Sequence, residues 1–572
     1  MGFYAKWWIY GTLVGLLLLS CDRDDLFKNN LHDTYAEGEY PTAAPCSGDA
    51  LTVRTVDGTC NDLELPAMGS AGMRLGRNMP IASTFQDTAN LMNPNPRDVS
   101  RELLTRGDEV TEVGQINYLA ASWIQFMVHD WFDHGENESE NPHIVPLQAD
   151  DPLGVPEMEI ERTRVDPTKD QNDGRPATFQ NTVTAWWDGS QIYGSDLATN
   201  NSLRSFVDGK LTMVDGRLPL DPVKGIDHTG FNKNWWVGLS MFHHLFTMEH
   251  NAIADRLKAS YPAWDDQKLY DTARLINAAV MTKIHTIEWT PAILKNNILD
   301  RAMNANWRGL FPTEGAHSGN VILHGIMGSN QNHHDVPYSL TEEFTAVYRM
   351  HPLLRDDVEI RDHQSNNLLT VSKLEDSAFE KAAGVVTDYG LTNLFYSFGH
   401  THPGALTTNN FPKFLQNFPM PNGSTLDLGA VDIIRDRERG VPRYNEFRRL
   451  LNLKAVNDFT DITPDTDLAE RMRAVYNDDI EALDLFVGSM AEGYRPPGYG
   501  FGETSFQVFI AMASRRLMSD RFYTTDYRDE IYTPEGMQWI EDSGINAVIL
   551  RHMPELSDAL AGNENAFFPW DE

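Results

Sequence analysis

The stretch Ser122–His134 (SWIQFMVHDWFDH) constrains the fold more than any other part of this chain. As a helix it would place Gln125 and His129 one turn apart on one face, within a surface of tryptophan, phenylalanine and methionine that must be buried. An unpaired buried polar group costs about 1–3 kcal/mol, so both side chains need polar partners or a ligand. A core histidine bonded to a carbonyl would be the simplest interpretation.

A second cluster, Glu342–Pro352 (EEFTAVYRMHP), favours a ligand instead. Tyr348 and His351 lie three residues apart in another apolar helical pattern, which Pro352 closes. Iron in a porphyrin is commonly held by a protein histidine. Two helices that each direct a histidine inward therefore indicate a planar iron cofactor between them.

Composition indicates one large acidic domain. The 572 residues contain no Ser/Gly-rich or charged linker and no internal repeat, and apolar residues make up 41% of them, so residues 43–572 are expected to form a single catalytic domain. The 82 acidic and 47 basic residues give a net charge of −35. This balance argues against binding to nucleic acid or to anionic lipid through surface charge.

The N-terminus has the pattern of an export signal. Residues 1–20 contain one lysine and the apolar run Trp7–Leu19, which is short for a membrane span but suits a signal peptide. The run ends LLLSC, which resembles the bacterial lipoprotein signal and predicts lipidation of Cys21. Because Leu19 is unusual two positions before that cysteine, ordinary secretion and a retained anchor stay open. We expect an exported periplasmic or cell-envelope lipoprotein of a bacterium.

The residues after the signal fit export as well. Residues 21–42 are polar and predict a flexible tether. After cleavage only Cys46 and Cys60 would remain besides the lipidated cysteine, and these two could close a small disulfide loop in an oxidising compartment.

An alternating segment, Thr184–Ser190 (TAWWDGS), could contribute to an oxygen cage. Side-chain oxygens, and the backbone carbonyl of Trp186, would lie on one side of an extended chain at Thr184, Trp186, Asp188 and Ser190. Asp130 points away from the His129 face and could add a second carboxylate. Hard cations such as Ca²⁺ prefer such ligands, although this alternation alone is more typical of a plain turn.

Two further helical patterns carry unusual polar groups. Leu269–Leu294 includes His285 and Thr290 among apolar neighbours, and the apolar run Ser505–Phe522 is interrupted by Arg515 and Arg516. An arginine directed inward there would bind a carboxylate well. In the helix expected over Leu239–Ser260, by contrast, we favour a structural over a metal-binding interpretation for His243, His244 and His250.

Several motifs in register resemble one family. QFMVHDW, TAWWDGS, FTMEHN, YRMHPLL and VPRYNEFRR are similar to the animal-type haem peroxidase superfamily, which includes myeloperoxidases and cyclooxygenases. DGTCNDLE, GRNMP, KIHTIEWT and MASRRL look most like its fatty-acid α-dioxygenases, which have bacterial members. The likeness runs from about Gly58 to the C-terminus. It implies a mainly α-helical, multi-helix fold with few short strands and haem buried between central helices.

The resemblance also implies roles around the haem. His129 would be the distal histidine, with Gln125 beside it, and His351 the proximal iron ligand, its other ring nitrogen held by Asn445. Calcium would be bound by Asp130, Thr184, Trp186, Asp188 and Ser190.

The substrate side follows from the same resemblance. Tyr348 matches the tyrosine that becomes a radical and removes hydrogen from C2 of a long-chain fatty acid, after which O₂ adds to give a 2-hydroperoxy acid. His285, Thr290 and an arginine would hold the substrate carboxylate. We assign the arginine to Arg515, with Arg516 as second choice. We expect the protein to act as a monomer.

Departures from the peroxidase pattern refine the expectation. Val128 occupies the position of one ester-forming acid, and the region of the distal arginine and second acid holds Asn232, Trp235 and Trp236. Haem b should therefore be bound non-covalently, with poor classical peroxidase turnover. Two alternatives stay open: a secreted haem peroxidase oxidising small substrates with hydrogen peroxide, and a catalytically silent haem- or lipid-binding lipoprotein.

Overall fold

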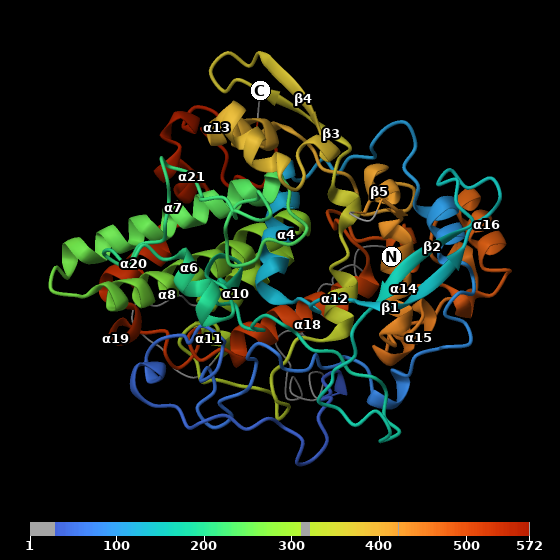
Figure 1. Ribbon diagram of the computed structural model, residues 1–572, viewed down its shortest axis with the longest axis horizontal. Helices are drawn as coiled ribbons and strands as arrows, with labels where there is room; N and C mark the ends of the chain where they lie inside the picture. Colours follow the sequence, from blue (N-terminus) through green and yellow to red (C-terminus); the bar gives the residue numbers. More distant parts are fainter. Residues whose placement is uncertain (1–28, 311–320, 421–422, 571–572) are drawn as a thin grey trace, which may run out of the picture.

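The computed structural model describes residues 29–310, 321–420 and 423–570, and this part of the chain is mainly helical with a few short strands (Figure 1). The expected fold class is thus confirmed. The expected signal peptide and Cys21 lie outside the described residues. Within those ranges, no helix combines the length and apolar character needed to cross a membrane.

The helices occur in chain order with these bounds: α3 (Pro96–Val99), α4 (Tyr118–Trp131), α5 (Ser190–Tyr193), α6 (Leu197–Leu203), α7 (Val237–Ser260), α8 (Asp266–Ile284), α9 (Thr290–Ile293), α10 (Asn297–Arg308), α11 (Val321–His324), α12 (Glu342–Val347), α13 (Lys381–His400), α14 (Leu428–Glu438), α15 (Tyr444–Leu450), α16 (Thr466–Val475), α17 (Leu485–Ala491), α18 (Glu503–Ser519), α19 (Asp529–Tyr532), α20 (Pro534–Asp542) and α21 (Ile545–His552).

The strands form antiparallel pairs. They are β1 (Glu138–Pro146) with β2 (Glu157–Arg162), β3 (Asp357–Arg361) with β4 (Leu368–Lys373), and β5 (Phe418–Pro419) with β6 (Thr425–Leu426). The β1–β2 hairpin connects the end of α4 to the segment that precedes α5. Met158 and Ile160 alternate with exposed residues along β2 and bury against Ile434 of α14, which supplies the apolar face that a hairpin needs.

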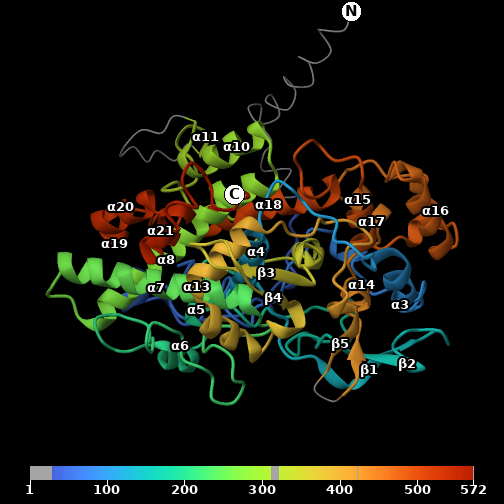
Figure 2. The same cartoon turned by 90° about the horizontal axis from the view of Figure 1, so that it is seen from above.

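Helix α4 lies in the interior, between the α7–α8 pair and the C-terminal helices on one side and α14–α17 on the other (Figures 1 and 2). It begins where Asn117 caps the backbone N–H of Ala120. Trp123 is fully buried and contacts Phe242 and Phe246 of α7 at ring-centroid distances of 5.4 and 5.5 Å. This aromatic packing fixes the helix that was expected from the sequence.

The second predicted helix is shorter than expected. α12 ends at Val347, Tyr348 is its C-cap, and His351 begins a separate 3₁₀ turn, His351–Leu353. Pro352 accounts for the break, because it has no N–H to donate to the carbonyl of Tyr348, four residues earlier, and its ring would clash with that carbonyl in a continuous helix.

The N-terminal segment is packed rather than free over its described part. Leu31 and Thr34 are buried, the Thr34 hydroxyl donates to the carbonyl of Leu75, and His32 pairs with Arg77 through backbone hydrogen bonds. Residues 31–34 thus pack against the domain, whereas residues 37–39 and 41–42 are exposed, and the tether expected over residues 21–42 stays a prediction. The expected disulfide between Cys46 and Cys60 is confirmed.

Candidate active site

The two histidine-bearing segments meet at the end of α4. The Trp131 ring contacts Tyr348 edge-on at 5.2 Å and Phe344 at 5.7 Å between centroids. Tyr348 is also flanked by Phe344 and by Phe509 of α18. The structure thus brings together the parts that hold His129 and His351, which are more than two hundred residues apart in the sequence.

His351 is held from behind by a carboxylate. Its Nδ1 donates to Oδ2 of Asp432 at 2.8 Å, and Arg349 binds the other Asp432 oxygen at 3.0 Å. Burial alone would raise the pKa of Asp432, but His351 and Arg349 lower it, so this group is a carboxylate. About 35% of the His351 side chain is exposed, and with Nδ1 engaged its Nε2 is the nitrogen available to a metal.

The expected partner of His351 is corrected by these contacts. The Asn445 amide donates to the carbonyl of Val456 and to Glu481, and its oxygen accepts from the Val456 N–H. Asn445 therefore braces the loop that follows α15, and Asp432 of α14 occupies the place we expected it to take. Asp432 stands in the charged run DIIRDRERG, where nothing distinguished it from the neighbouring acids.

On α4, His129 is buried and neutral. Burial lowers its pKa to about 3. Its Nδ1 has no hydrogen-bond partner among the described residues, and Phe231 covers the ring at 4.7 Å. One turn earlier, Gln125 accepts a 2.8 Å hydrogen bond from the indole of Trp236 and donates to the carbonyl of Asn234. Trp236, from the segment that lacks the distal arginine of classical peroxidases, thus positions Gln125.

These features fit a haem. His351 combines an engaged Nδ1 with an accessible Nε2, which is the form of a proximal ligand, and a neutral histidine on a facing helix suits the distal side. Val128 at the position of the ester-forming acid leaves no carboxylate there.

His285 lies among tryptophans and is oriented by one of them. The Trp123 indole donates to His285 Nδ1 at 3.3 Å, and Trp289 stacks on the ring at 4.7 Å. Burial, with a smaller contribution from Arg516, holds the pKa of His285 well below its usual value. A neutral imidazole that accepts at Nδ1 carries its proton on Nε2, so His285 is poised to donate from that nitrogen.

Thr290 is held next to His285 by an irregular helical turn. The segment His285–Trp289 forms a π-helical turn between α8 and α9, and the Thr290 hydroxyl donates to the carbonyl of His285 at 2.9 Å. Such turns often occur at functional sites, because the extra residue redirects the side chains that follow.

The structure reverses our preference between the two arginines. Arg515 donates to the carbonyls of Val336 and Pro337 at 2.9 Å each, so its guanidinium ties down a loop. Arg516 is also buried, but its Nε and Nη2 have no partner among the described residues, and its charge acts on His285. Burial lowers the pKa of Arg516, yet an arginine remains cationic. Arg516, rather than Arg515, is the residue placed to bind an anion.

Four of the five predicted oxygen ligands, Asp130, Thr184, Asp188 and Ser190, form one buried cluster. Ser190 donates to Asp130 through its backbone N–H at 2.6 Å and its hydroxyl at 3.0 Å, and the Thr184 hydroxyl donates to Asp188 at 2.9 Å. Burial and then the charge of Asp188 raise the pKa of Asp130 to about 8, while Arg274 binds the far oxygen of Asp188 at 3.0 Å. Two neighbouring buried carboxylates that repel each other fit a divalent cation.

The histidines of α7 have the structural roles that we favoured, with one exception. His244 accepts from the Leu218 N–H, and His250 bonds Tyr193 and the carbonyl of Gly209. Across the described ranges no group of three or more His, Cys, Asp or Glu side chains is arranged to hold a metal. His243 is fully buried, and neither of its ring nitrogens has a partner among the described residues.

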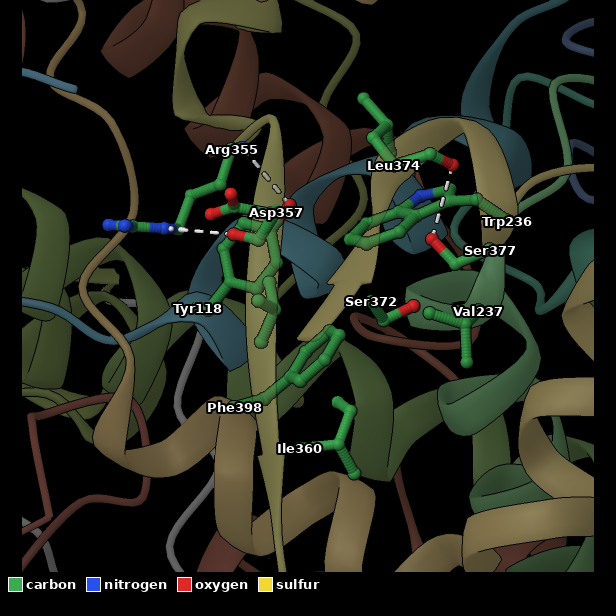
Figure 3. A pocket seen from close by; sticks show the side chains of 11 residues that line it. Tyr118, Trp236, Val237, Arg355, Asp357, Ile360, Ser372, Leu374, Ser377 and Phe398 are labelled. Atoms are coloured by element: carbon green, nitrogen blue, oxygen red, sulfur yellow. Dashed lines mark hydrogen bonds between the residues drawn. The ribbon is translucent and has the colours of Figure 1, made fainter. Parts of the chain in front are cut away.

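A small cavity lies beside Trp236 (Figure 3). Tyr118, Trp236 and Phe398 form its aromatic wall, with Arg355 and Asp357 at its edge. None of the predicted site residues lines it. The cavity touches the site only through Trp236, whose indole reaches Gln125.

Comparison with known proteins agrees with this site. The family model for animal haem peroxidases matches residues 53–567. Rice alpha-dioxygenase PIOX is 40% identical, covering 98% of this chain and 92% of the relative, and Arabidopsis thaliana alpha-dioxygenase 1 is 38% identical, covering 95% and 88%. The crystal structure of rice fatty acid alpha-dioxygenase superposes with a TM-score of 0.90 at 38% identity, covering 98% of this chain and 93% of that one. Another rice structure contains palmitic acid.

The chain therefore belongs to the animal haem peroxidase family. Its likeness to the rice and Arabidopsis enzymes extends over nearly the full length of both partners and places it, within that family, among the alpha-dioxygenases.

Proposed function

We propose that this protein oxygenates long-chain fatty acids at C2 with O₂, through a radical on Tyr348. The observation that carries the proposal is the buried guanidinium of Arg516, whose Nε and Nη2 have no hydrogen-bond partner among the described residues. Its Cζ lies 4.1 Å from the Trp131 ring centroid, and its charge acts on Tyr348 and His285. A buried cation that keeps N–H groups free, next to a buried phenol, is suited to hold a carboxylate while an adjacent carbon reacts.

The residues divide the reaction as follows. Arg516 binds the substrate carboxylate, His285 donates to it from Nε2, and Thr290 lies at the same turn. The Tyr348 radical takes the hydrogen atom from C2, O₂ adds to the carbon radical, and the resulting peroxyl group takes a hydrogen atom back from Tyr348. The product is a 2-hydroperoxy acid, which can lose CO₂ to give an aldehyde one carbon shorter. Burial raises the pKa of Tyr348, so the resting group is a phenol rather than a phenolate.

His351 and His129 would hold a non-covalent haem b on its two sides. When bound, the haem would supply the oxidising equivalent by which the Tyr348 phenol loses both an electron and its hydroxyl proton. His129 is neutral and can accept a proton from a peroxide bound near it, while Gln125 is kept beside it by Trp236. Asp432 strengthens the basicity of His351 by accepting from its Nδ1.

The role of Asp432 can be tested against that of Asn445. Asp432→Asn keeps the shape but removes the charge behind His351, and we expect about 10- to 100-fold weaker haem binding together with a higher iron reduction potential. Asn445→Ala, which changes only the contacts to Val456 and Glu481, serves as the matched control. Haem transfer to apomyoglobin measures the haem affinity of each variant, and spectroelectrochemistry measures its iron reduction potential. A larger effect of Asn445→Ala would restore the partner expected from the sequence.

We further propose that Asp130, Thr184, Asp188, Ser190 and the carbonyl of Trp186 bind Ca²⁺. The support is the pair of buried carboxylates with two hydroxyl groups already facing them. The cation would join the end of α4, which carries His129, to the loop before α5. It would also relieve the repulsion between the two carboxylates.

Calcium should therefore stabilise the protein. At a thousandfold excess over Kd, a ligand that binds only the folded state adds about 4 kcal/mol, so we expect thermal unfolding to occur several degrees higher in Ca²⁺ than in chelator. Asp188→Asn should lose most of this response. Differential scanning calorimetry of both proteins in Ca²⁺, Mg²⁺ and EGTA measures it, and an equal response to Mg²⁺ or none at all would contradict the site.

We also propose that the protein is exported and acts outside the cytoplasm, directed there by the N-terminal signal pattern and by lipidation of Cys21. The disulfide between Cys46 and Cys60 supports an oxidising compartment. Metabolic labelling with a fatty-acid probe, compared between the wild type and Cys21→Ala, tests lipidation directly.

A further inference from the structure

Arg516 has two aromatic contacts that carboxylate binding does not require. Its Cζ lies 4.1 Å from the ring centroid of Trp131 and 4.1 Å from that of Trp187, so the two indoles flank the guanidinium. The two rings are 5.7 Å apart, and Trp131 is 5.2 Å from Tyr348. All of these side chains are buried. An anion is held by N–H groups in the guanidinium plane, whereas these contacts occupy its faces.

The indoles are potential electron donors to the radical. If the Tyr348 radical took one electron from Trp131, the products would be a phenolate and an indole radical cation, and a second transfer would move the positive charge to Trp187. Burial raises the pKa of Tyr348 and outweighs the opposing effect of the Arg516 charge, so a phenolate is poorly tolerated there. The Nε1 groups of Trp131 and Trp187 have no hydrogen-bond partner among the described residues. The indole proton then has no local acceptor, and the positive charge stays on the ring.

We propose that Arg516 confines the oxidising equivalent to Tyr348 by making Trp131 and Trp187 harder to oxidise. The inference rests on the proposed function, because it takes Tyr348 as the site of the radical. A fixed positive charge in contact with both rings opposes the formation of a second positive charge on either, and the buried site leaves this repulsion largely unscreened. Trp131 therefore reduces the Tyr348 radical too slowly to compete with hydrogen transfer from C2 of the substrate.

The test uses the haem-loaded protein treated with hydrogen peroxide in the absence of fatty acid. Freeze-quench electron paramagnetic resonance identifies the radical, and peptide mass spectrometry quantifies oxidised tryptophan. In Arg516→Met we expect a smaller tyrosyl signal and about tenfold or more oxidation of Trp131 and Trp187 relative to the wild type. Arg516→Lys keeps a charge and should restore most of the protection. Arg515→Met, which loses hydrogen bonds to backbone carbonyls and the contact with the Tyr338 ring, should match the wild type.

Wild-type levels of tryptophan oxidation in Arg516→Met would overturn the inference. If that variant does not fold or does not bind haem, a measurement on the wild type alone still tests the inference. Trp131 should be oxidised no more than Trp289, which is linked to Tyr348 through the ring of Phe509 and donates to the carbonyl of Ala120. Preferential oxidation of Trp131 would also overturn the inference. Tyr348→Phe separates the two proposals: a radical signal unchanged by that substitution would refute the proposed function instead.

Discussion

Tyr348→Phe is expected to abolish palmitate-dependent uptake of O₂, with a loss of at least about three orders of magnitude. Phenylalanine keeps the ring that packs against Trp131, Phe344 and Phe509, so the site should retain its shape. What disappears is the O–H bond that accepts and returns the hydrogen atom of C2. An oxygen electrode with palmitate as substrate measures the rate.

The control for this variant is its haem chemistry. Because the contacts of His351 with Asp432 are untouched, the Soret band and any peroxide-driven oxidation of guaiacol should survive. Parallel loss of both activities would indicate a haem defect. Oxygenation of palmitate at the wild-type rate would refute the radical assignment, and strong guaiacol turnover without oxygenation in the wild type would favour the alternative of a secreted peroxidase.

The helices of the site could be predicted because the pattern of apolar residues within each segment indicates which face of the helix is buried. The aromatic surface of α4 leaves few ways to bury Trp123 and Trp131 except in the interior, so the direction of His129 followed. The end of α12 was predicted less well. Pro352 was identified as a closing residue, but its effect reaches back to Tyr348, which caps the helix instead of lying within it.

Partners from distant segments could not be derived in this way. Asp432 was hidden in a run of alternating charges on α14, and only the packing of α14 against the His351 turn singles it out. Asn445 had the right chemistry but binds Val456 and Glu481. A resemblance transfers residue types reliably and contacts less so, because a contact depends on how two separate elements meet.

The choice between Arg515 and Arg516 shows the same limit within one helix. The two residues differ by about 100° around α18, so one must face the loop at Val336 and the other the site. Both are buried, and the hydropathy pattern at the polar end of the helix did not indicate which of the two faces the site. The Nε of both arginines lacks a partner among the described residues, but only Arg516 also keeps an unpaired Nη, whereas the Nη groups of Arg515 bind backbone carbonyls. This difference is visible only in three dimensions.

Arg516→Met should therefore lower kcat/KM for palmitate far more than Arg515→Met. Loss of one partner from a buried charge pair costs about 3–5 kcal/mol, which corresponds to roughly 10²- to 10³-fold or more in kcat/KM. Most of the loss should appear in KM, and a neutral substrate of equal length, such as palmityl alcohol, should be much less affected by the substitution. Steady-state O₂ uptake with both substrates measures the difference. Arg515→Met serves as the control because the Arg515 guanidinium is already engaged by the carbonyls of Val336 and Pro337. Equal losses in the two variants, or a larger loss in Arg515→Met, would show that Arg516 does not bind the carboxylate.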